Sequence, residues 1–285
     1  MLVLEFKAYG KEIQYKAIDE AIRTGQFIRN KCLRLWMDTP NIGRYDLNKY
    51  CKTLADEFPF AKDLNSMARQ SSAERAWSSI SRFYDNCKKQ IPGKKADATP
   101  RRRQAQGNAH QAGYPKFKKF SRSVEYKTTG WKLSDDTKWI KFTDKKGIGK
   151  LKLKGTWDLW RYDQKLIKRV RLVRRADGYY VQFCVKVEVT ESIEPSRKNV
   201  GLDVGLKEFY TDSDGNIEPN PRFYRKGEKR LKFYSSRVSR KKKGSFNRKR
   251  AINKLGRTHL KISRQRNEHA KRIARCVIHS NDVVA

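Results

Sequence analysis

One carboxylate in an apolar stretch is the clearest candidate for chemistry in this chain. Asp203 lies within Val-Gly-Leu-Asp-Val-Gly, with a glycine two positions to either side. A buried carboxylate is costly unless it is hydrogen-bonded, paired with a base or bound to a cation. Asp203 is therefore a candidate catalytic metal ligand on the first strand of an RNase H-like sheet, where glycines let a phosphate backbone approach closely. A strand-end aspartate that faces water explains the motif equally well.

The acidic residues that follow Asp203 do not complete a metal site. The Asp-x-Gly pattern also resembles the phosphate loop of sugar kinases and actin-like ATPases, but that loop usually has Ser or Thr where Leu206 stands. Glu208, Asp212 and Asp214 are close in sequence. Strand alternation places both aspartates at a hairpin tip, where Asp commonly forms turns. We therefore expect no metal cluster from these three carboxylates.

Aromatic and basic residues interleave in one short segment, Tyr-Pro-Lys-Phe-Lys-Lys-Phe at 114–120. Aromatic rings in such a segment can stack nucleic-acid bases, at about 1 to 3 kcal/mol per base, while lysines contact phosphates. Rings packed against the protein, with solvated lysines beside them, are an equally good interpretation for any one residue. The candidate binding residues are Tyr114, Lys116, Phe117, Lys118 and Lys119.

A denser block of bases lies nearer the C-terminus. Between Arg222 and Arg275, only Glu228 and Glu268 oppose a long series of Lys and Arg. A run of like charges can be a solvated face, but this density within a pair of helices favours contact with phosphates. The candidates are Arg240, Lys241, Lys242, Lys243, Arg248, Lys249, Arg250 and Arg266.

The overall charge indicates the class of partner. Lys and Arg number 67 against 30 Asp and Glu, which gives a formal net charge of +37 at pH 7. Such an excess requires a polyanion, and nucleic acid is the obvious one. About ten phosphate contacts would make log affinity fall with log salt at a slope near −9. A ribosomal-type basic protein is the plainer alternative.

Membrane and disulfide classes are not supported by the sequence. It has no run of about 18 apolar residues and no signal-peptide pattern, so we expect a cytoplasmic protein. The five cysteines include no Cys-x-x-Cys pair, and the four histidines show no ligand spacing with them. We therefore expect neither a disulfide framework nor a zinc site within this chain.

The sequence up to residue 195 predicts a strand, a group of helices, a loop and a sheet, in this order. Alternating apolar residues predict a strand in 1–11, and three-to-four-residue spacing predicts helices over 12–90. Residues 91–112 are predicted to form a basic, flexible loop. Period-two alternation and the Asp177-Gly178 turn signal predict an antiparallel, barrel-like sheet over 113–195. We expect the N-terminal strand to pair with this sheet, so that the helices are an insertion.

The last part, 196–285, begins with two short strands and continues as basic helices. An apolar stripe at helical spacing is predicted to pack on the sheet while bases on the other faces meet phosphate. It comprises Ala270, Ile273, Ala274, Val277 and Ile278. Asp282 to Ala285 starts like a buried strand. The predicted fold class is thus mixed α+β, with several domains.

Several of these stretches, in this order, resemble the TnpB (OrfB) family of transposon-encoded RNA-guided nucleases, relatives of type V CRISPR effectors. They are YPKFKKF, RVRLVRRADGYYVQFCVKV, GLDVGLKEFYTDSDG and LKFYSSRVSRKKKGSFNRKR. The resemblance implies a β-barrel wedge domain at 1–11 and 113–195 and a helical recognition domain at 12–90. It also implies a partial RuvC domain of RNase H-like fold at 196–285.

The same resemblance implies a mechanism and partners. Asp203 would be the first of three RuvC carboxylates, and two Mg²⁺ ions would support phosphodiester hydrolysis. A guide RNA from the transposon end would read the DNA target by base pairing. We expect the protein in the prokaryotic cytoplasm, associated with the nucleoid.

Two departures from the family pattern qualify this expectation. Residues 96–112 resemble an insertion. The second carboxylate, the zinc-binding Cys pairs and the final Asp of the family are expected beyond Ala285, so we predict a truncated chain that binds RNA and DNA without a complete catalytic site. Whether it is an enzyme stays open, and a nuclease-dead RNA-guided DNA-binding regulator is the alternative.

Overall fold

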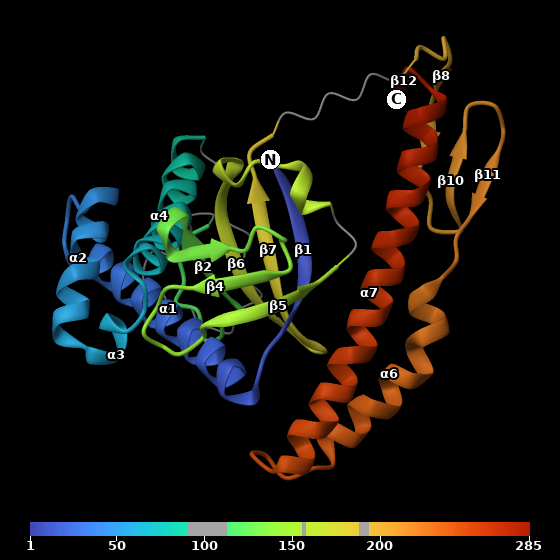
Figure 1. Ribbon diagram of the computed structural model, residues 1–285. Helices are drawn as coiled ribbons and strands as arrows, with labels where there is room; N and C mark the ends of the chain where they lie inside the picture. The colour runs from blue at the N-terminus through green and yellow to red at the C-terminus, as the bar shows by residue number, and fades with distance from the viewer. Residues whose placement is uncertain (90–112, 156–157, 188–193) are drawn as a thin grey trace. The chain divides into compact units, whose positions relative to one another are not determined.

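The computed structural model contains two compact units, Met1–Glu188 and Val189–Ala285 (Figure 1). The structure describes all of the chain except residues 90–112, 156–157 and 188–193. The basic loop and the insertion predicted in the first of these segments therefore lie outside the described residues. Each unit is considered by itself below.

The first unit is built on a seven-stranded antiparallel sheet. The N-terminal strand lies inside this sheet, where Phe6 pairs with Val181 and Lys7 with Lys154. The prediction that it joins the later strands is therefore confirmed. In order across the sheet the strands are β2 (Ser123–Lys127), β6 (Ile167–Arg175), β7 (Gly178–Val185), β1 (Leu2–Tyr9), β5 (Lys150–Lys154), β4 (Trp139–Phe142) and β3 (Trp131–Leu133).

This sheet curls into a half-barrel, which confirms the barrel-like prediction in part. Its two edge strands, β2 and β3, are joined in sequence by a single turn of 3₁₀ helix, Thr128–Gly130. The Thr143 amide beside β4 donates to the Gly130 carbonyl at 3.1 Å. The rings of Tyr126 on β2 and Phe142 on β4 lie 4.8 Å apart, so the two ends of the sheet approach one another.

Among the described residues, four helices lie between β1 and β2 in the chain and share one hydrophobic core with the sheet. The helical spacing within 12–90 places Ile18, Ile22, Ile28 and Cys32 on one helix face, and all four are buried. The division of this unit into helical and barrel domains stays a prediction. The helices are α1 (Glu12–Asp38), α2 (Arg44–Glu57), α3 (Pro59–Lys62) and α4 (Ser66–Lys88).

A buried carboxylate links α4 to the sheet. Glu125 on β2 is 2% exposed and accepts hydrogen bonds from Ser71, Arg169 and Arg171. Burial by itself raises the pKa of this carboxyl. The bonds from Arg171, Ser71 and Arg169 outweigh burial and lower the pKa to about 2. Glu125 is therefore a charged anchor inside the first unit.

The second unit contains two small sheets. In the first, β9 (Leu202–Asp203), β10 (Glu208–Asp212) and β11 (Ile217–Pro219) form an antiparallel meander. In the second, β8 (Asn199–Val200) pairs in parallel with β12 (Val283–Val284). This pairing confirms the strand predicted at the end of the chain, but Val283 and Val284 are exposed, so the predicted burial is wrong. An RNase H-like arrangement for this unit stays a prediction.

Two basic helices complete the second unit, α6 (Phe223–Ser239) and α7 (Phe246–Ser280). The apolar stripe predicted on α7 is only partly covered: Ile273 and Val277 are half-buried, but Ile278 is 55% exposed. Strands of two to five residues offer too little apolar surface to cover it. Within the described residues, no helix is long and apolar enough to cross a membrane.

Candidate nucleic-acid interface

The turn between α6 and α7 is held by the side chains around it. Gly244 takes a φ of +85°, which favours glycine. The Ser245 side chain then accepts from the Arg248 amide at 3.2 Å and caps α7. Arg248 Nη1 donates to the carbonyls of Val238 at 2.8 Å and Lys241 at 3.0 Å. These bonds satisfy carbonyls at the end of α6 and fix the two helices as a hairpin.

A close approach of backbone and side chain sets the packing of this hairpin. A Cβ added to Gly227 on α6 would lie 2.5 Å from Ile262 Cδ1 on α7, so a larger residue there requires the Ile262 side chain to shift. Ile262 and Leu231 are the buried apolar residues of the two helices. With so narrow an apolar contact, much of both helices stays accessible.

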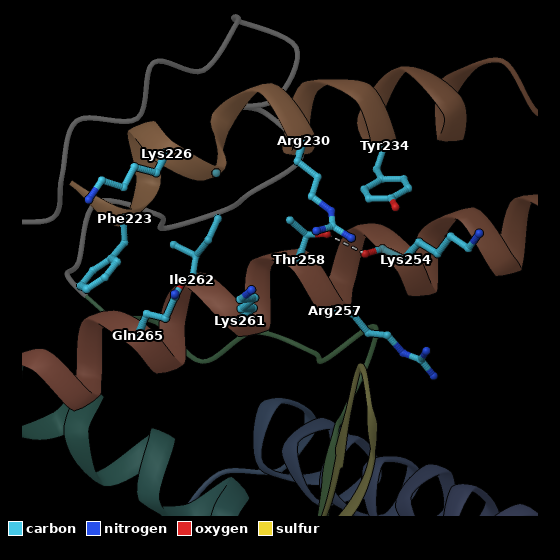
Figure 2. Close-up of a pocket in the computed structure, with 11 residues that line it drawn as sticks. Phe223, Lys226, Arg230, Tyr234, Lys254, Arg257, Thr258, Lys261, Ile262 and Gln265 are labelled. Carbon is cyan, nitrogen blue, oxygen red and sulfur yellow. Dashed lines mark hydrogen bonds between the residues drawn. The ribbon is translucent and has the colours of Figure 1, made fainter. Parts of the chain in front are cut away.

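A basic groove of about 730 Å³ runs between α6 and α7 (Figure 2). No acidic residue is among those that line it. The spacing explains the arrangement, because positions three or four apart share a helix face. The polar and aromatic lining includes Phe223, Tyr234, Thr258 and Gln265, and the bases are Lys226, Arg230, Lys254, Arg257 and Lys261.

The aromatic and basic segment after residue 113 is docked on α1 through its backbone. Asn30 accepts from the Lys118 amide at 3.0 Å and donates to the Lys118 carbonyl at 2.9 Å. Gln26 donates to the Lys118 and Lys119 carbonyls, and Arg29 donates to that of Lys116. Because α1 holds the backbone, this docking leaves the side chains accessible.

The side chains of this segment divide between packing and exposure. The Tyr114 ring lies 5.2 Å from that of Phe83 and so packs on the helices, although the residue stays 40% exposed. Lys116, Phe117, Lys118 and Lys119 are exposed. The pKa of the Lys118 ammonium is lowered by partial burial and by neighbouring arginines. This cluster of positive charge suits an anionic partner.

Asp203 is not buried, although its apolar neighbours in sequence suggest burial. It ends β9, opposite Thr211 on β10, and is exposed, so its carboxylate does not need a cation to offset desolvation. Asp212 accepts from the amides of Asp214 and Asn216, which confirms its predicted role as a turn residue. Among the described residues, no group of three or more His, Cys, Asp or Glu is placed to hold a metal. Asp203 and the other described acidic residues do not fit a two-Mg²⁺ centre.

Part of the chain is similar to known proteins. Residues 182–285 match the OrfB_IS605 family model, described as "Probable transposase". The chain is 26% identical over 171 residues to "Putative RNA-guided DNA endonuclease InsQ" of Escherichia coli K12, covering 59% of this chain and 40% of that protein. Residues 182–285 are thus similar to the TnpB (OrfB) family.

A second relative of the chain is "Putative RNA-guided DNA endonuclease" of Streptomyces pristinaespiralis. It is 31% identical over 110 residues, which cover 39% of this chain and 27% of the relative. The matches thus span less than half the length of either relative. The family-model match includes Asp203 and the whole α6–α7 hairpin.

The basic residues predicted in the α6–α7 hairpin lie in two settings. Arg248 is half-buried and bonded to the turn, whereas the other predicted bases are exposed. The sequence analysis did not name the groove bases as candidates. Their spacing of three or four residues, on the same helix faces as Leu231 and Ile262, could have identified them. The exposed set is Arg240, Lys241, Lys242, Lys243, Lys249, Arg250 and Arg266.

Proposed function

We propose that this TnpB-like chain binds a guide RNA from the transposon end and a DNA target, and that the α6–α7 groove contacts phosphates. The groove carries the proposal, because five bases line it without an acid. Bases that crowd one helix face repel one another. A phosphate backbone offsets that repulsion and releases counterions on binding.

The parent activity in this proposal is RNA-guided, Mg²⁺-dependent DNA cleavage, in which Asp203 would be the first metal ligand. Two Mg²⁺ ions would supply activation of water and stabilisation of the leaving oxygen. The described residues offer Asp203 without the partners that such a centre needs. The second candidate is a regulator that occupies DNA with a guide RNA and does not cut it.

A salt titration of binding tests the groove. Replacing four groove bases with Gln (Lys226, Arg230, Lys254, Lys261) is expected to reduce the slope of log affinity against log salt by about 3. The matched control replaces Lys229, Lys271, Arg272 and Arg275, which are exposed bases of the same helices outside the groove. Equal losses in both variants would show that charge alone matters and would overturn the groove site.

Plasmid cleavage in Mg²⁺ distinguishes the two candidate functions. The purified chain is tested with its copurifying RNA beside Asp203→Ala. Cutting that disappears in Asp203→Ala would establish the nuclease and contradict the regulator. Bound RNA without cutting in either protein would support the regulator.

A further inference from the structure

Two cysteines of the first unit lie in contact inside its helices. Cys32 on α1 is completely buried, and Cys51 on α2 is 3% exposed. Cys32 Sγ lies 3.9 Å from the Leu47 carbonyl oxygen, and Cys51 Sγ lies 3.4 Å from the same oxygen. The side chains of the two cysteines are also hydrogen-bonded to one another. We call Cys32 and Cys51 the thiol pair, because these contacts place their sulfur atoms within reach of one another.

The hydrogen bonds of the thiol pair distinguish its two sulfur atoms. A thiol has one proton and donates to one acceptor at a time, whereas its sulfur also accepts weakly. Cys51 has two carbonyls in reach, those of Leu47 at 3.4 Å and Arg69 at 3.5 Å. The Cys32 thiol donates to the Cys51 sulfur, and this bond lowers the pKa of Cys51 and raises the pKa of Cys32. Cys51 is therefore the member of the pair that more readily becomes a thiolate.

Positive charge near the thiol pair also favours a thiolate at Cys51. Arg69 and Lys127 lower the pKa of Cys51 by their charge, whereas burial raises it. The Arg69 guanidinium is held in place by donating to the carbonyls of Ala61 at 3.2 Å and Lys62 at 3.1 Å. The thiolate is the form of cysteine that reacts with peroxides and disulfides. Cys51 thus combines a favoured thiolate with a second thiol in contact with it.

Core packing accounts for a single buried cysteine but does not require two in contact. Free cysteines commonly serve as small apolar residues. Cys184 on β7 fits that role, because it is completely buried and its burial raises its pKa. In the thiol pair, by contrast, one cysteine donates to the other. Two sulfur atoms in contact need only a short movement to reach the bonded distance of about 2 Å in a disulfide.

A reagent reaches the thiol pair when α2 opens, because both cysteines are shielded from solvent in the closed unit. α2 has 14 residues, of which Leu47, Cys51, Leu54 and Ala55 are buried. A short element with few buried apolar residues opens at a lower free-energy cost than the main core of a unit. Opening of α2 exposes Cys51 first, since Cys51 belongs to the buried face of that helix.

We propose that the thiol pair is a peroxide-sensitive site, in which Cys51 and Cys32 form a reversible disulfide between α2 and α1. The Cys51 thiolate attacks one oxygen of a hydroperoxide and the O–O bond breaks, which oxidises the sulfur to a sulfenic acid. The other oxygen takes up a proton and leaves as water or an alcohol. The Cys32 sulfur then attacks the sulfenic sulfur, and the hydroxyl group leaves as water with the Cys32 proton. One hydroperoxide is reduced for each disulfide formed.

The disulfide is expected to tie α2 to α1 across their connection at 39–43. A crosslink removes conformational freedom from the opened chain, so opening of α2 becomes less favourable. Exchange with a small dithiol reverses the link. The oxidation state of the thiol pair thus determines how firmly α2 is held on the inserted helices.

Hydrogen peroxide treatment followed by peptide mapping tests the thiol pair in the full-length chain. Every sample carries Cys276→Ser, which removes an exposed thiol and so prevents links between molecules. The folded protein is oxidised, its remaining thiols are capped, and trypsin cuts after Lys and Arg. This digestion is expected to release residues 32–34 joined to residues 50–52, and dithiothreitol should separate them. The melting temperature of the oxidised protein is expected to rise by about 5 to 10 °C and to return to its original value in dithiothreitol.

Two matched variants show whether the thiol pair itself reacts. Cys51→Ala is expected to abolish both the joined peptides and the rise in melting temperature. Cys184→Ala, at another buried cysteine of the same unit, is expected to retain both. The joined peptides are also measured in the parent protein, so the test does not depend on the folding of either variant. Folded protein without joined peptides, Cys32 joined to a different cysteine, or a link that forms only in denaturant would each overturn the proposal.

Discussion

The two compact units of this chain differ in what holds them together. In Met1–Glu188, helices and sheet enclose one continuous core that runs from Leu4 to Val185. In the described part of Val189–Ala285, the buried apolar residues are Val200, Leu231 and Ile262. Burial of apolar area is the main stabilising contribution to a fold. The first unit therefore depends on its core, whereas the second is held by a few contacts beneath a dense layer of charge.

The two units also differ in how their basic residues are paired with acidic ones. In the first unit, Glu125 and Glu74 are buried among arginines and neutralise part of their charge. In the α6–α7 hairpin, Glu228 pairs with Arg225 and Lys232, and the groove bases face no acid of the groove lining. Acids inside the first unit thus stabilise its fold, while the second unit leaves its bases available to a polyanion.

The largest expected effect comes from the buried anchor of the first unit. Glu125→Gln leaves Arg169 and Arg171 without their shared carboxylate, so we expect the free energy of unfolding to fall by about 3 to 5 kcal/mol. Chemical denaturation of the variant against Glu20→Gln, an exposed control, measures the loss. A loss of less than 1 kcal/mol, on the order of a surface pair, would contradict the anchor.

The same carboxylate predicts a pH dependence. Its folded pKa of about 2 lies below the ordinary value of 4.5, so its contribution to stability is complete above pH 4.5. That contribution is lost progressively as pH falls from 4.5 toward 2. The difference in unfolding free energy between wild type and Glu125→Gln should narrow in this window and in no other.

An intermediate effect is expected where the hairpin is narrowest. Gly227→Ala places a methyl group 2.5 Å from Ile262 Cδ1, which forces the Ile262 side chain out of its packed position at an expected cost of about 1 to 3 kcal/mol. Adding Ile262→Ala should relieve that clash, so the double variant should lose less than the sum of the two single losses. Thermal unfolding followed by circular dichroism measures the cycle, and strictly additive losses would refute the close contact.

The smallest expected effect separates two neighbouring bases of the hairpin. Arg248→Gln removes bonds to the Val238 and Lys241 carbonyls and is expected to cost about 1 to 2 kcal/mol. Lys249→Gln changes an exposed side chain and should leave stability within about 0.5 kcal/mol while weakening RNA binding. Proteolysis of the hairpin and a salt titration of RNA binding measure the two responses. Equal stability for both variants would contradict a structural role for Arg248.

Local patterns made much of the fold predictable. The period-two alternation of β5 and the helical stripe containing Ile18 and Cys32 describe single elements, whose geometry follows from nearby residues. Asp212 was predicted to form a turn because Asp bonds to amides a few residues away. The apolar stripe of α7 was less predictable, because its cover depends on residues distant in sequence.

The candidate site likewise has features that local sequence predicts and features that depend on residues distant in sequence. The net charge, the bases of the hairpin and the position of Asp203 follow from the sequence alone, because they are properties of single residues and short motifs. Tertiary structure decided that Arg248 supports a turn and that lysines stand opposite lysines on the sheet. The physical reason is that helix packing and strand register bring together residues far apart in the chain, such as Lys7 and Lys154, and local sequence does not specify those distances.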